Sequence, residues 1–270
     1  MNHLRINNDD APKVHHYQQH ADGVLLSFTV IVCDLMLSIE DFPFTTLPAG
    51  DIIRTIKKTG DDHMENRTIS VEQMRKSDAY TIANFVESRE LMYRAAMGVY
   101  NSYEGWKGKK IAIVVGGGNN GGDGYALAGI LKKDGIDSVI IKVSEKMSED
   151  GKYYSGIANE LGVRSEVFAP ETDLSGYDVI VDCILGTGFS GEVRGNARTA
   201  IDAINRSGAY VISVDINSGM NGDTGEAVTA VHSDLTVSIG FIKNGLVTES
   251  AKKYIKELTN IDIGIVLVDE

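Results

Sequence analysis

Residues 111–124 read IAIVVGGGNNGGDG and carry the clearest structural pattern in the sequence. Its first five residues form an apolar run that ends in glycines, which is typical of a strand buried in a parallel sheet. The glycines let the backbone adopt positive φ and approach a ligand closely, with N–H groups facing outwards. Residues 122–133 continue with apolar side chains at helical spacing. The stretch therefore predicts a strand, a glycine-rich turn and a helix.

The same unit recurs along the chain. Strands are expected over residues 109–115, 138–143, 177–184, 209–215, 234–239 and 263–268, and helices over 70–85, 88–103, 122–133, 151–161, 196–207 and 248–258. This alternation predicts an α/β, Rossmann-like three-layer fold, with a mostly parallel central sheet and helices on both faces. Ligands of such sheets bind beyond the carboxyl ends of the strands, which directs attention to the loops after Val115, Asp182 and Val214.

The composition restricts the class of protein. A net charge of −12 over 270 residues argues against a nucleic-acid binder, because such proteins present basic stripes. With only Cys33 and Cys183, neither a disulfide framework nor a zinc spacing is available. The apolar stretch 24–37 is too short to span a membrane, and it follows acidic residues rather than the basic start of a signal peptide. We therefore expect a cytoplasmic protein with neither a membrane nor a nucleic-acid partner.

Residues 1–63 differ from the rest of the chain. They hold five of the six histidines and no glycine-rich loop. His15, His16 and His20 could bind a metal, although a flexible polar end is the simpler interpretation. Met64 could be the natural start, preceded by an extension, a misread start or an added segment. We expect an N-terminal extension of unknown role over 1–63 and the α/β domain over 64–270.

The turn that follows the first strand departs from the usual dinucleotide fingerprint. Its glycines satisfy G-x-G-x-x-G from Gly116 to Gly121, but Lys142 and Ser144 stand where an acidic ribose ligand is usual. The carboxylate of Asp123 would repel a pyrophosphate in the same turn, whereas carboxylate and amide oxygens suit a hard cation or sugar hydroxyls. Simple turn formation with helix capping is the alternative.

Two later strands also end in acidic side chains. Asp182 stands on an apolar strand, where an unpaired buried charge is costly. A cation shared with Asn120 would supply a partner, and backbone N–H groups are the alternative. Asp215 ends the next strand and Ser218 follows it, while the run Gly186–Glu192 is a second candidate phosphate cradle. Because parallel strands end at one edge of a sheet, these polar groups should converge at the expected crevice.

Three motifs occur in order: G-x-G-N-N-G-G-D-G at 116–124, D-x-x-x-G-T-G-x-S-G-E-V-R at 182–194 and S-V-D-I-x-S-G-x-x-x-D-T-G-E at 213–226. With the helix opening at 69–75, they closely resemble the NAD(P)H-hydrate epimerases, the YjeF N-terminal domain. The resemblance spans about Met64 to the C-terminus. It implies an isomerase that interconverts the R and S epimers of hydrated NADH and NADPH, a metabolite-repair reaction.

The resemblance also implies roles for the residues of these loops. The hydrated dinucleotide would contact the first turn, at Asn119, Asn120, Gly121, Gly122 and Asp123. Its phosphates would contact the second loop, at Gly186, Thr187, Gly188, Phe189, Ser190, Gly191 and Glu192. Its reactive portion would contact Asp215. A potassium ion would be bound by Asn120, Asp182 and Ser218. Because the dehydratase domain often fused to this one is absent before Glu270, a separate NAD(P)H-hydrate dehydratase is the expected functional link. The amphipathic first helices could pair two subunits into a homodimer.

The implied substrate is a hemiaminal with a hydroxyl on C6 of the ring, next to nitrogen. Inversion at C6 requires cleavage of the C–O or C–N bond and re-addition from the other face, which one acid/base group near the hydroxyl can assist. Asp215 is expected to be that group, with Lys243 as its partner; a solvated surface lysine is the alternative for Lys243. His232 is expected in a surface loop.

Two other functions fit parts of the pattern. A non-catalytic nucleotide- or protein-binding scaffold could share the fold, since fold alone does not establish chemistry. The presence of Asn120, Asp182, Asp215 and Ser218 weighs against it. An ordinary dehydrogenase is disfavoured by the missing acidic ribose ligand and by the carboxylate inside the turn.

Overall fold

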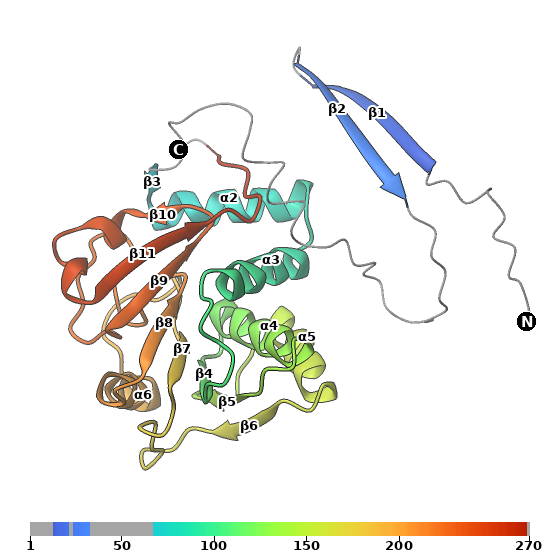
Figure 1. The fold of residues 1–270 in the computed structure, drawn as a ribbon. Coiled ribbons are helices and arrows are strands. Elements are labelled where there is room, and N and C mark those ends of the chain that lie inside the picture. The colour runs from blue at the N-terminus through green and yellow to red at the C-terminus, as the bar shows by residue number, and fades with distance from the viewer. Residues whose placement is uncertain (1–12, 22–23, 33–66, 269–270) are drawn as a thin grey trace, which may run out of the picture. The chain divides into compact units, whose positions relative to one another are not determined.

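The computed structural model describes residues 13–21, 24–32 and 67–268 (Figure 1). The chain separates into two compact units, residues 1–60 and 61–270. In the first unit, β1 (Lys13–Ala21) and β2 (Val24–Val32) pair as an antiparallel two-stranded sheet. The side chains of the β1 histidines and the residues around Met64 lie outside the described part of the chain, so the metal and start-site interpretations stay predictions.

The second unit is built on a parallel sheet of seven strands, in the order β11-β9-β8-β7-β4-β5-β6. The chain winds outwards from β4 through β5 to β6, and then continues from β7 on the other side of β4. At such a switch point the loops that leave the two central strands separate and open a crevice. The strands are β4 (Ile111–Val115), β5 (Ser138–Lys142), β6 (Arg164–Val167), β7 (Val179–Cys183), β8 (Tyr210–Val214), β9 (Ser233–Ile239) and β11 (Ile255–Ile261).

Helices cover both faces of this sheet (Figure 1). One layer contains α3 (Ser88–Asn101), α4 (Asn119–Lys133) and α5 (Glu149–Glu160), which pack on one another and on the sheet. The other face is covered by α6 (Gly195–Arg206). The α/β, Rossmann-like three-layer fold predicted from the sequence is therefore confirmed.

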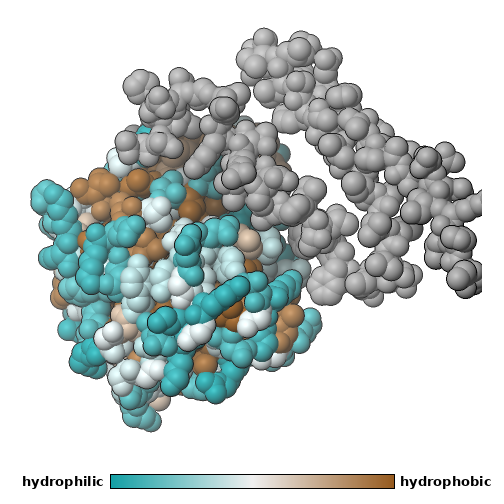
Figure 2. Space-filling model, viewed as in Figure 1, coloured by the Kyte–Doolittle hydropathy of each residue, from teal (hydrophilic) through white to brown (hydrophobic). Residues whose placement is uncertain are grey.

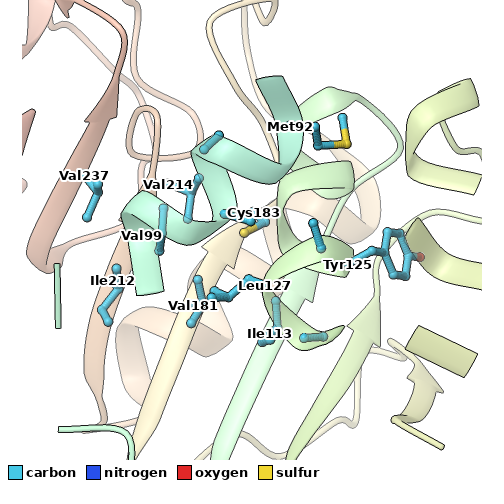
Figure 3. Packing of buried hydrophobic residues seen from close by; sticks show 14 of the residues in the cluster. Met92, Val99, Ile113, Tyr125, Leu127, Val181, Cys183, Ile212, Val214 and Val237 are labelled. Atoms are coloured by element: carbon cyan, nitrogen blue, oxygen red, sulfur yellow. The ribbon is translucent and has the colours of Figure 1, made fainter. Parts of the chain in front are cut away.

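Side-chain alternation divides the central strands between two cores. Ile113 and Val181 belong to the cluster under α3 and α4, part of which Figure 3 shows. Val114 and Ile180 point to the other face and pack under α6. Every residue of β4 and β7 is buried, and each large apolar side chain removed from water contributes about 1.5–3 kcal/mol. These two strands are thus a firm base for the loops at their carboxyl ends.

Helix α4 begins at Asn119, with Gly118 as its N-cap, and not at Gly122 as predicted. The backbone N–H of Gly122 donates to the carbonyl of Gly118 at 3.2 Å. The Asn-Gly run therefore forms the first helical turn instead of a loop. Its low helix propensity is overridden by close packing on the sheet, where a Cβ at Gly124 would lie 3.0 Å from the Cβ of Cys183.

Two predictions near the C-terminus are wrong. The expected helix over 248–258 is replaced by a short 3-10 turn, η2 (Ala251–Lys253), followed by the edge strand β11. By pairing with β9, β11 forms hydrogen bonds with backbone groups of β9 that would otherwise be unpaired at the sheet edge. These hydrogen bonds outweigh the helical propensity of the Lys- and Glu-rich stretch. The expected strand over 263–268 is irregular. Strand β6 escapes prediction because its four residues are all exposed and show no apolar pattern.

Helix α2 (Val71–Asn84) begins as the capping box predicts, since Ser70 Oγ accepts a hydrogen bond from the backbone N–H of Gln73 at 3.0 Å. It lies near the carboxyl ends of the strands, next to α3 (Figure 1). Just before it, β3 (Thr68–Ile69) pairs in parallel with β10 (Ile242–Lys243). The 3-10 turn η1 (Asn244–Val247) follows β10 directly.

The C-terminal segment is attached to α2 by hydrogen bonds. The backbone N–H of Val266 donates to Thr81 Oγ1 at 2.9 Å, and that of Val268 donates to Ser77 Oγ at 3.0 Å. Gln73 Nε2 donates to the Val268 carbonyl at 3.2 Å. Polar side chains of α2 therefore form the hydrogen bonds with the backbone of this segment that a neighbouring strand would form in a sheet.

Among residues 67–268, no helix is both long enough and apolar enough to cross a membrane. The face seen in Figure 2 is mostly hydrophilic, and its apolar residues lie mainly in the upper part of the coloured surface.

Replacing Thr81 with valine should destabilise the domain. The variant keeps the side-chain shape but removes the hydroxyl that accepts the Val266 N–H, and the loss of such a hydrogen bond costs about 0.5–1.5 kcal/mol. The free energy of unfolding, measured in urea, should fall by that amount. Thr199→Val is the matched control, because Thr199 Oγ1 also bonds a carbonyl one turn back but holds no second segment. Equal losses in the two variants would contradict the role given to Thr81.

Candidate active site

A cavity of about 620 Å³ opens at the carboxyl ends of β4 and β7, where the sheet has its switch point. Its floor is formed by the loops that leave these two strands. Its walls include Met74 and Asp78 from α2 and Leu91 and Met92 from α3. The volume is in the range of small-molecule sites, and its place agrees with the crevice predicted for a parallel sheet.

The floor brings two backbone segments into contact. A Cβ at Gly116 would overlap the carbonyl oxygen of Ile184, and a Cβ at Gly121 would overlap the carbonyl oxygen of Gly116. The backbone N–H of Gly116 also donates to the Cys183 carbonyl at 3.0 Å. Only glycine fits at 116 and 121, whereas Gly118 faces open space and leaves its backbone accessible from the cavity.

Asp182 lies fully buried behind this floor, with neutral donors around its carboxylate. Oδ1 accepts from Ser218 Oγ at 2.5 Å and from the Ile184 N–H at 3.2 Å. Oδ2 accepts from Ser213 Oγ and from the Ser218 N–H, both at 2.9 Å. Burial raises the pKa of the Asp182 carboxyl, although these hydrogen bonds lower it in part. The group is well satisfied in hydrogen bonds, but it has no ion-pair partner among residues 67–268.

Leu185 connects this carboxylate network to Asn120. Asn120 Nδ2 donates to the Leu185 carbonyl at 3.0 Å, Ser218 Oγ lies 3.2 Å from the same oxygen, and the Leu185 N–H donates to Ser218 Oγ at 2.8 Å. Within the described part of the chain, the buried Oδ1 of Asn120 has no hydrogen-bond partner. An orphaned amide oxygen near a buried carboxylate and a hydroxyl is a donor set suited to a hard cation.

Asp215 has an unusual backbone at the cavity edge. Its φ is +67°, and among the described residues no other non-glycine residue has positive φ. Lys243 Nζ donates to Asp215 Oδ1 and to the Ile239 carbonyl, the latter at 2.8 Å. Lys243 is only 1% exposed, so the interpretation as a solvated surface lysine is wrong. A strained backbone conformation costs free energy and persists only where the surrounding structure enforces it. Such residues cluster at functional sites.

Gly186 lies between Asn120, one of the candidate cation ligands, and Asp215. A Cβ built on Gly186 would lie 3.2 Å from Asn120 Cβ and 3.5 Å from Asp215 Oδ2. The backbone N–H of Thr187 donates to the same Asp215 oxygen at 3.4 Å. The loop after β7 therefore joins the two groups of polar residues at the cavity floor.

Three further carboxyls line the cavity, Asp78, Asp123 and Asp150. Burial raises the pKa of Asp123 well above its usual range, and the negative charges of Asp215 and Asp78 raise it further, with Lys243 opposing them. Burial and the charge of Asp215 also raise the pKa of Asp78. Raised pKa values favour the protonated forms, which can donate hydrogen bonds and repel a phosphate less. This weakens the electrostatic objection to a dinucleotide in the Asp123 turn.

Most of the predicted site residues do meet at this cavity. It is lined by Asn119, Asn120, Asp123, Gly186, Thr187, Gly188, Phe189 and Asp215. Asp182, Ser218 and Lys243 are buried behind its floor.

The structure leaves some predicted residues outside the cavity lining, namely Gly121, Gly122, Ser190, Gly191 and Glu192. Both helix glycines are buried. Glu192 is instead ion-paired with Arg194 at 3.2 Å and with Arg198 at 3.7 Å. The sequence does not predict that α2 and α3 supply walls of the cavity. Both helices precede the first central strand, and their sequences do not indicate which loops of the sheet they will cover.

This arrangement supports acid/base chemistry more readily than covalent catalysis. A carboxylate–ammonium pair stands at the floor and apolar side chains stand at the walls. Cys183 has a free thiol at the end of β7, but it is fully buried and burial raises the pKa of its thiol well above the usual range. A thiol held in this form is a poor nucleophile.

Comparison with known proteins gives a consistent match. The family described as "YjeF-related protein N-terminus" matches residues 88–245, more than half of the chain. The NAD(P)H-hydrate epimerase of Oenococcus oeni is 38% identical over 204 residues, which cover 73% of this chain and 96% of that protein. The bifunctional NAD(P)H-hydrate repair enzyme Nnr of Coxiella burnetii is 34% identical over 72% of this chain and 40% of its own length. The crystal structure of yeast ynu0 shares the fold, with a TM-score of 0.59 and 22% identity over 72% of this chain and 87% of that one.

Gly116→Ala should destabilise the protein, because the added methyl group would overlap the Ile184 carbonyl and push the two floor loops apart. Overpacking of this kind costs about 1–3 kcal/mol or more, which thermal unfolding would register as a lower midpoint. Gly118→Ala is the control, since its methyl group would meet open space. A Gly116→Ala protein as stable as the Gly118→Ala protein would show that the loops are not in contact.

Proposed function

Because the chain belongs to the family of YjeF-related protein N-termini, we propose that it is an NAD(P)H-hydrate epimerase that interconverts the R and S epimers of hydrated NADH and NADPH. Its relative in Oenococcus oeni carries that name and is matched along nearly its whole length. The single observation that carries the proposal is the Asp215–Lys243 pair, held at a strained backbone position on the floor of the switch-point cavity.

The reaction needs a proton to move at the C6 hydroxyl of the hydrated ring. Whether the C–O or the C–N bond opens, the leaving group must gain a proton and the re-adding group must lose one. Asp215 is the proposed acid/base group, because it faces the cavity with its Oδ2. Among the residues that the structure describes, this oxygen accepts a hydrogen bond from the Thr187 N–H alone, at 3.4 Å. Lys243 would hold the other oxygen in place. The apolar side chains of Leu91, Met92 and Ile239 would exclude bulk water from the ring.

The dinucleotide would lie along the cavity floor. Gly118 and Asn119 expose the start of α4 to the cavity, and a helix N-terminus favours negative charge. The Gly186–Phe189 segment supplies a second stretch of accessible backbone. The proposed phosphate contacts also include Ser190, Gly191 and Glu192, which lie outside the cavity lining.

A potassium ion is the proposed cofactor, with Asn120, Asp182 and Ser218 as its protein ligands. The orphaned Asn120 Oδ1 and the buried Asp182 carboxylate, surrounded by neutral donors, are the observations that support it. Bound there, the ion would supply a fixed positive charge that offsets Asp182 and favours the anionic dinucleotide nearby. No redox or covalent chemistry is required of it.

A functional link to an NAD(P)H-hydrate dehydratase belongs to the same proposal. The Coxiella burnetii relative is named a bifunctional NAD(P)H-hydrate repair enzyme, and this chain matches 40% of its length. The present chain would then supply the epimerase step, and a dehydratase acting on one epimer would consume its product.

Asp215→Asn should slow epimerisation by about 10²–10⁴-fold, the usual contribution of an acid/base group. Asparagine tolerates the positive φ at this position, so the fold and hydrate binding should be kept. The measurement starts from one purified epimer of hydrated NADPH and follows the appearance of the other by chromatography. Asp234→Asn is the matched control, because Asp234 also pairs with a lysine, Lys256, but lies outside the cavity. Turnover of the Asp215 variant at the wild-type rate would dismiss the assignment.

Potassium should stabilise the folded protein against heat, because a cation that binds only the native state adds about 2.7 kcal/mol at a hundred times its dissociation constant. We expect the unfolding midpoint to rise when tetramethylammonium chloride is replaced by potassium chloride at equal ionic strength. Asn120→Ala should abolish this rise, and Asn119→Ala, which removes a neighbouring exposed amide, should keep it. The same midpoint in both salts for the wild-type protein would argue against the cation site.

A further inference from the structure

The residues NGDTGE at 221–226 belong to the third sequence motif, yet they do not line the cavity. They form a loop that is closed on itself. The Asn221 N–H donates to the Glu226 carbonyl at 2.9 Å, and the Gly225 N–H donates to the Asn221 carbonyl at 2.8 Å. Asn221 Oδ1 accepts from the backbone N–H groups of Asp223 and Thr224, both at 2.9 Å. We call residues 221–226 the clamp loop.

The clamp loop holds the first residue of α2. Asp223 Oδ1 accepts the backbone N–H of Val71 at 2.8 Å, across 152 residues of sequence. This N–H belongs to the first turn of the helix, where backbone donors have no partner within the helix. The two segments also pack closely, since a Cβ at Gly222 would lie 2.5 Å from Val71 Cγ2. A carboxylate at this end also interacts favourably with the helix dipole.

On its other side, the clamp loop contacts the turn that follows Lys243. The Gly245 N–H donates to the Gly222 carbonyl at 2.7 Å. Gly225 has a φ of +70°, and a Cβ there would overlap the Gly245 carbonyl oxygen. The loop is therefore fixed to the segment that carries the ion-pair partner of Asp215, and it starts only three residues after the buried Ser218.

Helix α2 depends on such hydrogen bonds more than on apolar packing. Its buried residues are Gln73, Met74, Ser77 and Thr81, three of which are polar. Met74, Arg75, Asp78 and Ile82 nevertheless form a wall of the cavity. A helix that is held mainly by polar contacts can shift when one of them is lost, and this wall would shift with it.

We infer that Asp223 is a positioning residue of the site, which acts through α2 by fixing the start of the helix to the clamp loop. The inference rests on the proposed epimerase function only for its kinetic consequences. Asp215 directly follows β8, and Lys243 lies in β10, which pairs with β3 and not with α2. The wall would contact substrate and transition state alike, so its displacement should weaken binding more than it slows the chemical step.

Asp223→Ala in the full-length protein should therefore raise the KM for hydrated NADPH by roughly three- to tenfold, the effect of losing one helix cap, with little change in kcat. Asp223→Asn keeps an oxygen that can accept the Val71 N–H and should return KM close to the wild-type value. Asp178→Ala is the matched control. Asp178 Oδ2 accepts the Lys110 N–H at 2.8 Å and is also exposed, but it joins segments at the amino end of β4, away from the cavity. An unchanged KM in Asp223→Ala, or an equal rise in Asp178→Ala, would overturn the inference.

Hydrogen exchange tests the clamp without any assay of activity. Amide groups of residues 71–78 should exchange faster in Asp223→Ala than in the wild-type protein, and Asp178→Ala should leave them unchanged. Unaltered exchange in α2 of Asp223→Ala would overturn the inference whatever the kinetics show. A wild-type protein without epimerase activity but with faster α2 exchange in Asp223→Ala would instead refute the proposed function and keep the clamp.

Discussion

The burial of one carboxylate, Asp182, is the constraint on which the site depends. An unsolvated negative charge at the end of β7 must collect hydrogen-bond donors, and it takes them from Ser213, Ile184 and both polar groups of Ser218. These bonds draw the loops after β7 and β8 together. Between Ser213 and Ser218 the chain must turn sharply, which is consistent with the positive φ of Asp215 and with its side chain lying at the cavity floor.

Much of this geometry could be predicted from the sequence, because it follows from parallel-sheet topology. Apolar runs identified β4, β7 and β8, and the carboxyl ends of parallel strands share one edge. Asn120, Asp182 and Ser218 therefore had to come close whatever the details of the loops, and the Leu185 backbone joins two of them directly. The Ser70 cap of α2 was equally accessible, because it depends only on residues three positions apart.

Features that depend on contacts between distant segments could not be predicted. The burial of Lys243 follows from the pairing of β10 with β3, two strands of two residues each that carry no apolar pattern. Strand β11 has helical propensity and becomes a strand only because β9 offers it an edge. The α2 wall is set by the clamp loop and by the C-terminal segment, both more than 150 residues away. Such contacts leave no periodic signal in the sequence.

The central claim is that a cation site and an acid/base pair flank the nicotinamide end of a bound dinucleotide. A crystal structure of the full chain with NADP and thallium(I), a heavy substitute for potassium, would show both at once. We expect an anomalous peak contacted by Asn120, Asp182 and Ser218, with the nicotinamide ring next to Asp215. A peak elsewhere, or a dinucleotide bound away from the floor between β4 and β7, would contradict it.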